Sequence, residues 1–154
     1  MLHLEQFEAL MTELGPVLNP LGISYFSGDN TWEVQLDEET GVLVDFLADQ
    51  DKFVLHCELG APPAGDRFNL YELLLRYNYH WNDTGGGRMA LDENGGKVVF
   101  LFESSAHDMD MTQLTTILRN FHDAALAWKI VVQESGPTQS PQSTEHMFAN
   151  MIRG

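Results

Sequence analysis

The side chains best suited to chemistry are six histidines and one cysteine, and their spacing argues against a catalytic or metal site. The histidines lie in separate parts of the chain, at positions 3, 56, 80, 107, 122 and 146. None forms the HxH, HExxH or Cys-His spacing that holds a metal ion. His56 and Cys57 are neighbours in an alternating run, so in a strand their side chains point to opposite faces. We therefore predict no catalytic residue, no metal ligand and no cofactor, with Cys57 as a small core residue.

Two further motifs resemble ligand sites but are better explained as local structure. Gly85-Gly86-Gly87 could form a phosphate cradle, yet a strand pattern follows it and the Gly-Lys-Ser/Thr ending is missing. Asp108 and Asp110 match half of a calcium loop, but the glycine and distal glutamate that complete such a loop are missing. We predict a flexible turn at the glycines and helix capping by the aspartates.

The acidic composition narrows the range of partners. Eight Lys and Arg residues stand against 23 Asp and Glu, a formal charge of -15, which repels nucleic acids and anionic membranes. Acidity of this degree either serves solubility or keeps exposed apolar patches from self-association. Residues 1–14 carry three glutamates where a secretory signal would be apolar, and no apolar run is long enough to span a membrane. We expect one soluble cytosolic domain that neither binds nucleic acid nor inserts into a membrane.

The first half of the chain predicts a helix followed by a three-stranded antiparallel meander. Apolar residues recur at spacings of three and four over residues 4–14, and Gly15 and Pro16 should end that helix. Three runs of alternating polarity follow, at residues 32–36, 42–48 and 53–59. Short polar turns separate these runs, as expected for neighbouring antiparallel strands.

The second half predicts a helix, a hairpin and a last helix. The second helix begins near Asp66 or Asn69, with a capping-box spacing from Asn69 to Glu72, and reaches about Trp81. Residues 89–91 and 98–102 form a hairpin across the turn 92–96. The last helix begins near Asp110, with Gln113 as capping partner, and ends near Val132. The fold class is therefore α+β, with a domain at residues 1–132 and a flexible C-terminal tail at 133–154, in which 147–152 is apolar again.

The second helix is apolar on two sides, which suggests a second copy of the chain as partner. One stripe contains Leu70, Leu73, Leu74, Tyr77 and Trp81, and the other contains Phe68, Tyr71, Leu75 and Tyr79. A sheet covers only one such stripe, so the other requires a second cover. The same helix of a twin subunit would supply it, giving a homodimer, although the first helix or a loop of the same chain is the alternative.

The order of elements, together with several local stretches, resembles class I type III secretion chaperones, the Tir-chaperone (CesT) family. The resemblance covers about residues 2–132. It includes Leu4-Glu5-Gln6-Phe7, Leu59-Gly60-Ala61-Pro62-Pro63, the segment 78–91 with its glycine turn, and the closing helix. The family varies widely in sequence, so the weight lies on order, size and acidity together. The tail after Val132 is longer than the family pattern, which leaves a self-masking or partner-docking role open for residues 147–152.

The resemblance implies a homodimeric chaperone of the bacterial cytoplasm that binds N-terminal segments of type III secretion effectors and keeps them stable and export-competent. It further implies the ATPase of the secretion system as a partner, and no nucleotide use by the chaperone itself. The candidate effector-binding residues are Leu2, Leu10, Val17, Leu43 and Leu47. The candidate dimer-interface residues are Tyr71, Leu74, Leu75 and Tyr79. Ordinary core packing is the alternative for the effector-binding residues.

Two other functional classes remain open at this point. A non-secretory protein-binding or regulatory domain of the same fold would share the core without binding effectors. An enzyme would require a concave pocket with convergent titratable groups, for instance around His56, Cys57 or His80.

Overall fold

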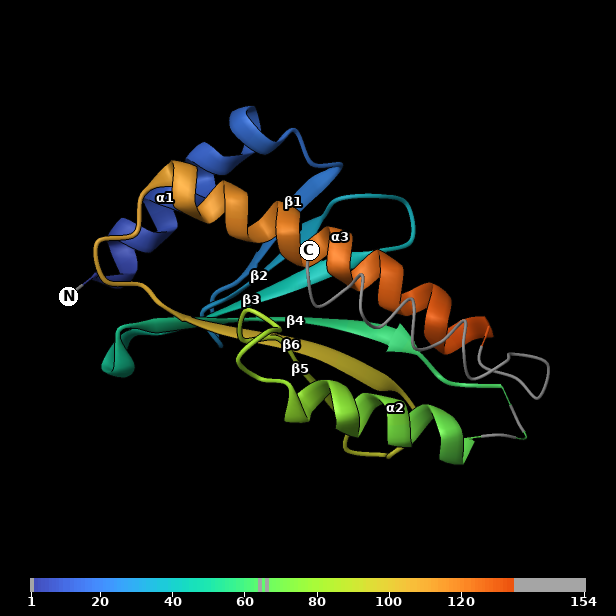
Figure 1. The fold of residues 1–154 in the computed structure, drawn as a ribbon. Helices are drawn as coiled ribbons and strands as arrows, with labels where there is room; N and C mark the ends of the chain where they lie inside the picture. The colour runs from blue at the N-terminus through green and yellow to red at the C-terminus, as the bar shows by residue number, and fades with distance from the viewer. Residues whose placement is uncertain (1, 64, 66, 135–154) are drawn as a thin grey trace. The chain divides into compact units, whose positions relative to one another are not determined.

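A computed structural model describes residues 2–63, 65 and 67–134 of the chain (Figure 1). The elements in chain order are α1 (Leu4–Leu18), β1 (Gly22–Phe26), β2 (Thr31–Gln35), β3 (Gly41–Leu47), the 3-10 helix η1 (Ala48–Gln50), β4 (Lys52–Gly60), α2 (Arg67–Tyr79), β5 (Arg88–Leu91), β6 (Val98–Ser105) and α3 (Met111–Glu134). Within the described part, six strands form one sheet in the order β1-β2-β3-β4-β6-β5. The α+β fold class is thereby confirmed, whereas the predicted tail from residue 135 onward and the alternative helix start at Asp66 lie outside the described residues.

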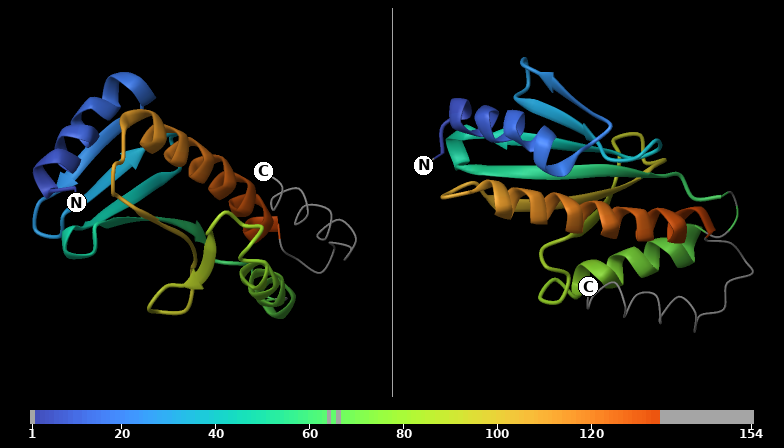
Figure 2. Two further views of the ribbon diagram at one scale, coloured as in Figure 1. Left: turned by 60° about the vertical axis from the view of Figure 1, so that its left-hand side comes forward. Right: turned by 90° about the horizontal axis from the view of Figure 1, so that it is seen from above.

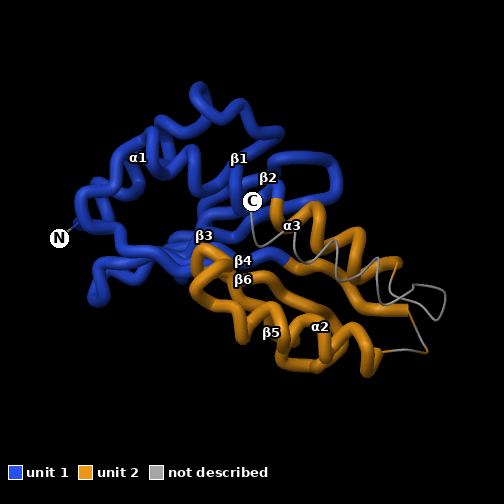
Figure 3. The backbone as a smooth tube through the Cα atoms, viewed as in Figure 1, with its two compact units in different colours: residues 1–57, 102–123 blue, residues 58–101, 124–154 orange. Residues whose placement is uncertain are grey.

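The chain forms two compact units, coloured separately in Figure 3. Unit 1 contains residues 1–57 and 102–123, and unit 2 contains residues 58–101 and 124–154.

In unit 1, α1 covers one face of a four-stranded antiparallel meander (Figure 2). Its buried stripe is Phe7, Met11 and Leu14, as the helical spacing predicted. The ring of Phe7 stacks on Phe46 with centroids 4.6 Å apart and meets Trp32 edge-on at 5.3 Å. Inward and outward residues alternate along β2, β3 and β4, so the three predicted strands are confirmed.

Helix α1 is one turn longer than predicted. Pro16 lies inside the helix, which continues to Leu18 and ends where Asn19 adopts the left-handed conformation (φ 52°). The backbone N–H of Asn19 donates to the carbonyl of Gly15 at 2.9 Å and closes the last turn. Proline lacks a backbone N–H and removes one hydrogen bond from the helix, and the left-handed Asn19 supplies a favourable C-cap three residues later.

Strand β1 was not predicted, and the meander has four strands instead of three. It pairs with β2 over five positions, from Gly22 opposite Gln35 to Phe26 opposite Thr31. Four of its five residues are exposed, so it lacks the clear alternation of buried and exposed positions that marks the other strands of unit 1. Its pairing with β2 decides its conformation, which a local polarity pattern does not contain.

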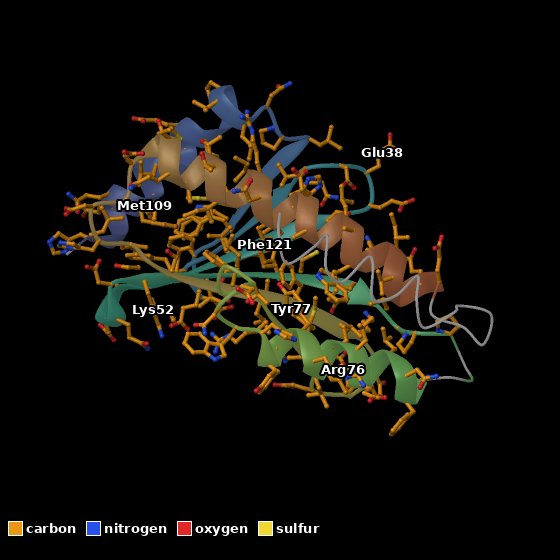
Figure 4. All side chains as sticks on the ribbon, in the orientation of Figure 1. Glu38, Lys52, Arg76, Tyr77, Met109 and Phe121 are labelled. Atoms are coloured by element: carbon orange, nitrogen blue, oxygen red, sulfur yellow. The ribbon has the colours of Figure 1, made fainter. Side chains whose placement is uncertain are left out.

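In unit 2, α2 contacts β5, and its buried residues are Leu70, Leu74 and Tyr77. The ring of Tyr77 meets Phe100 of β6 edge-on, with centroids 6.3 Å apart. The side chain of Asn78 donates to the carbonyl of Met89 at 2.9 Å and accepts from the N–H of Met89 at 2.8 Å, which ties the helix end to β5. Burial raises the pKa of Tyr77 to about 12. The neighbouring Arg76 is exposed (Figure 4). The hairpin is confirmed with Met89 opposite Phe100.

The glycine turn before the hairpin is needed for close packing. Gly85 and Gly86 have positive φ angles of 65° and 98°, which glycine adopts without strain. Gly87 is buried, and a Cβ atom at this position would lie 2.6 Å from the hydroxyl of Tyr77 and 2.8 Å from the ring of Phe100. The turn therefore brings backbone directly against two aromatic rings.

Helix α3 begins with the predicted capping box. Asp110 Oδ1 accepts from the N–H of Gln113 at 2.8 Å, and Gln113 Oε1 accepts from the N–H of Asp110 at 3.0 Å. The predicted stripe is buried at Leu114, Leu118, Phe121, Ala125 and Trp128, with Ile117 half-buried. The helix extends at least to Glu134, two residues past the predicted end.

Candidate protein-binding surfaces

Four exposed apolar side chains gather at the end of α1 and along β1, and we call them the edge surface: Val17, Leu21, Tyr25 and Phe26. Their exposed fractions are 48%, 65%, 41% and 48%. Single exposed apolar residues are normal on protein surfaces. Here they lie on both faces of the edge strand, because Tyr25 stacks on Trp32 on the α1 side and neighbouring side chains of a strand point to opposite faces, which places Phe26 on the other side. An edge strand with exposed apolar side chains on both faces suits another protein.

Two contacts of Tyr25 hold this surface in place. Its ring stacks on the indole of Trp32, with centroids 4.5 Å apart and planes inclined by 17°. Its hydroxyl donates a hydrogen bond of 2.8 Å to Oε1 of Glu8 on α1. This bond to a carboxylate, together with the negative charge of Glu8, raises the pKa of Tyr25. Strand β1 is thus joined to both the meander and the helix above it.

The backbone of β1 is also available for pairing with another strand. β1 stands at one end of the strand order, so no strand in the described part of the chain pairs with its outer edge. An unpaired edge presents alternating N–H and C=O groups, to which an extended segment of another protein adds as a further strand. The edge surface would then receive the apolar side chains of that segment.

The five predicted effector-binding residues do not share one surface. Val17 belongs to the edge surface, and Leu10 is half-buried on α1. Leu2 is half-buried before α1 begins, and its N–H donates to Asp51 Oδ1 at 2.8 Å. The remaining two, Leu43 and Leu47, are half-buried on β3.

Leu43 and Leu47 lie on the other face of the meander from α1. Phe46 faces Phe7 of α1, and side chains alternate along a strand, so positions 43, 45 and 47 point away from the helix. Between the two leucines, Asp45 accepts hydrogen bonds from Thr31 at 2.6 Å and from His56 at 2.9 Å. The bond from His56, aided by that from Thr31, outweighs partial burial and lowers the pKa of Asp45. This face therefore combines half-buried leucines with a polar network across three strands.

A second apolar surface lies on α2 in unit 2, and we call it the outer stripe of α2: Phe68, Tyr71, Leu75 and Tyr79. Three of its members, Phe68, Leu75 and Tyr79, are 75%, 68% and 81% exposed, and Tyr71 is half-buried. Spacings of three and four residues place them along one side of the helix. An exposed stripe with three aromatic rings fits a protein interface far better than water.

Leu74 differs in position from the other three predicted dimer-interface residues. It was grouped with the dimer-interface residues, but it is only 5% exposed and lies with Leu70 and Tyr77 on the buried side of α2. Positions 70, 74 and 77 share one side of a helix, and this side packs within the chain itself. Tyr71, Leu75 and Tyr79 remain available to a partner. Phe68, which was not among the predicted interface residues, has the same exposure and spacing and could have been included.

His56 and Cys57, the neighbouring residues suited to catalysis, do not point into one site. His56 bonds to Asp45 on the half-buried face of the meander, whereas Cys57 is buried at 3% exposure on the core side. Where side chains are described, no group of three His, Cys, Asp or Glu residues is arranged to hold a metal ion. None of the helices described is long and apolar enough to cross a membrane.

One pocket in unit 1, with a volume of about 420 Å³, lies beside the start of α3. It is lined by Ser104, Ser105, His107, Met109, Thr112, Gln113, Thr116 and Ile117. His107 is the titratable group among these residues, and its ring nitrogens lie 3.4 Å from Asp51 Oδ2 and 3.3 Å from Asp108 Oδ2, two carboxylates outside the lining.

Comparison with known proteins identifies relatives of this arrangement. The Tir chaperone protein (CesT) family model matches residues 18–129. A search of curated protein sequences found no match. The chain is similar to a solved structure of the ExsC-ExsE complex, with 19% identity and a TM-score of 0.73 over 88% of this chain and 100% of that one.

Two further complexes share the fold. The HopA1-SchA chaperone-effector complex has 14% identity and a TM-score of 0.63, covering 84% of this chain and 94% of that chain. The heterodimeric ExoU-SpcU complex from the type III secretion system of Pseudomonas aeruginosa has 19% identity and a TM-score of 0.58, covering 82% and 98%.

Proposed function

Because the chain belongs to the Tir chaperone protein (CesT) family, we propose that it binds a segment of a type III secretion effector and keeps it stable and export-competent. The family model matches most of the chain and agrees with the family resemblance described from the sequence. The observation that carries the proposal is the edge surface beside the unpaired edge of β1. Such a site binds through backbone hydrogen bonds and apolar contacts, and it requires no reaction.

The effector segment would lie extended along β1. Its backbone would pair with the outer edge of the strand, its side chains on the α1 side would contact Val17 and Leu21, and those on the other face would contact Phe26. Leu10 would border this site on α1. Leu43 and Leu47 lie on the same face of the meander as Phe26, two strands away, and would take part only if the segment crosses that face.

We also propose a homodimer formed through the outer stripe of α2. Phe68, Leu75 and Tyr79 lose little by being exposed singly, but together they place three large apolar side chains in water. Pairing this stripe with the same stripe of a second copy gives a two-fold symmetric contact. The cytoplasm of a bacterium is the proposed site of action, with the ATPase of the secretion system as a later partner.

Co-purification with the tagged full-length chain from its native bacterium, followed by mass spectrometry, tests the effector proposal. Recovery of a secreted effector is expected. Its binding segment should then lose at least tenfold in affinity for a Leu21→Ser/Phe26→Ser variant, because two central contacts are removed. Leu91→Ser, at an apolar position of unit 2 that is 43% exposed, is the matched control and should bind normally. Recovery of non-secreted proteins alone would support the regulatory-domain alternative instead.

Light scattering of the purified chain tests the dimer separately. The wild type and the Leu21→Ser/Phe26→Ser variant should both have the mass of two chains. Leu75→Glu/Tyr79→Glu should have the mass of one, because charges would enter the interface centre. A monomeric wild type at tens of micromolar would refute the dimer and leave the effector proposal standing.

A further inference from the structure

The C-terminal part of α3 carries an apolar pair on the side opposite to its buried stripe. Trp128 is 1% exposed and meets Tyr77 edge-on, with ring centroids 4.9 Å apart. Leu126 and Ile130 are each two positions from Trp128, about 200° around the helix. They are 36% and 50% exposed and lie one turn apart. We call Leu126 and Ile130 the outer pair of α3.

We propose that residues 147–152 of the same chain dock on the outer pair of α3. This C-terminal segment reads Met147-Phe148-Ala149-Asn150-Met151-Ile152. In a helical conformation its two i,i+4 pairs, Met147 with Met151 and Phe148 with Ile152, form one apolar stripe. This stripe is about one helical turn long, as is the spacing between Leu126 and Ile130. The docked segment and the outer pair of α3 would therefore shield each other from water.

The connection between the two has a suitable length. Residues 135–146 join Glu134 to the segment, and Gly136, Pro137 and Pro141 disfavour a continued helix there. Twelve residues span at most about 40 Å when extended. Ile130 lies about 6 Å along the helix axis from Glu134, so the chain has ample length to turn back. Tethering raises the local concentration of the segment to the order of millimolar, which favours it over any untethered competitor of equal affinity.

Charge also favours this occupant. The formal charge of the chain is -15, and two copies of it repel each other. Residues 135–154 contain only Glu145 and Arg153 among Asp, Glu, Lys and Arg, so they carry no net side-chain charge. A neutral apolar segment approaches the acidic domain without charge repulsion, whereas a further acidic chain beyond the proposed α2 dimer would be repelled. The docked segment would remove the outer pair from water and oppose aggregation through it.

Methyl NMR tests the contact directly, because the chain has only four isoleucines: Ile23, Ile117, Ile130 and Ile152. In the full-length protein the δ1 methyl of Ile130 should show NOE cross-peaks to the ring of Phe148 and a ring-current shift. Phe148→Ala should abolish that shift and move the Ile130 resonance to its position in a chain ending at Glu134. The methyls of Ile23 and Ile117 should stay in place, as should all four in the matched tail variant Thr144→Ala.

Two results would overturn the proposal. An Ile130 resonance that is identical in the wild type and Phe148→Ala would show that the segment does not contact the outer pair. NOE cross-peaks found only between labelled and unlabelled chains in a mixed sample would assign the contact to a second copy. Neither result bears on effector binding at the edge surface, which involves residues of unit 1.

Discussion

The ring of Tyr25 stacks on Trp32 at a centroid distance of 4.5 Å, and this contact fixes the edge strand β1 to the core of unit 1. Trp32 is 4% exposed, and its other side meets Phe7 of α1. An edge strand with four exposed residues has little apolar burial of its own. Beside the half-buried Ile23, the stacked pair therefore anchors the strand, and the proposed effector site depends on it.

Replacement of Tyr25 tests this anchorage. Tyr25→Ala should lower the free energy of unfolding by about 1–3 kcal/mol, because both the ring pair and its buried area are lost. Tyr25→Phe keeps the stack and removes only the exposed hydrogen bond to Glu8, so its cost should stay below about 1 kcal/mol. Urea denaturation measures both values. Equal losses in the two variants would place the anchorage in the hydroxyl instead of the ring.

Gly87 should tolerate no side chain. Gly87→Ala forces a methyl group to within 2.6 Å of the Tyr77 hydroxyl and 2.8 Å of the Phe100 ring, so one of them must move. We expect a loss of about 1–3 kcal/mol in stability, as for other overpacked cores. Gly96→Ala is the control, since a Cβ there meets nothing within 4 Å. Thermal unfolding of both variants decides the point, and similar melting temperatures would contradict the packing argument.

Thr115 should be replaceable by valine without loss. The residue is 6% exposed, and among the side chains described its Oγ1 is the buried polar atom without a hydrogen-bond partner. Thr115→Val removes this unsatisfied hydroxyl at nearly constant volume and should be neutral or stabilising by up to about 1 kcal/mol. Thr115→Ser keeps the hydroxyl, removes a methyl group and should destabilise by about 1 kcal/mol. A clear loss in Thr115→Val would reveal a partner, such as a bound water.

Stability should decline in acid partly through Asp45. Hydrogen bonds from His56 and Thr31 hold the pKa of this carboxyl below its ordinary value in the folded protein. The carboxylate therefore contributes stability above the unfolded pKa of about 4, and this contribution is lost as the pH falls through the lower folded pKa. Asp45→Asn should flatten the decline in unfolding free energy between about pH 5 and pH 2. Asp49→Asn, at an exposed position of η1, controls for the loss of one charge and should leave the decline unchanged.

Elements with strong local signals were predictable from the sequence. The β5–β6 hairpin follows from alternating residues around Asp92 and Gly95, and the structure pairs Leu91 with Val98 as expected. The start of α3 follows from Asp110 and Gln113, whose side chains make the reciprocal bonds. In both cases the interacting groups are close in sequence, so a short window contains the whole cause.

Features decided by distant contacts were not predictable. Strand β1 depends on its pairing with β2 and on the stack of Tyr25 on Trp32, and neither is visible in residues 22–26 alone. The alternating polarity of residues 42–48 correctly predicted that Leu43 and Val44 point to opposite faces of the sheet. It contained no information on which of these faces α1 covers. Leu74 lies at the boundary between two stripes of α2, and only packing within unit 2 assigns it to the core. Apart from Val17, the residues of the edge surface were missed for the same reason as the strand itself.

The buried position of Cys57 provides a built-in chemical reporter of unfolding. It is the only cysteine of the chain, and on β4 it is 3% exposed. A thiol reagent therefore reacts at this position only when β4 detaches from its neighbours. The rate of labelling then measures how often the centre of the sheet opens, without any engineered probe. A bound effector segment that stabilises the meander would slow this labelling, so one native atom allows the proposed binding to be followed in the unmodified protein.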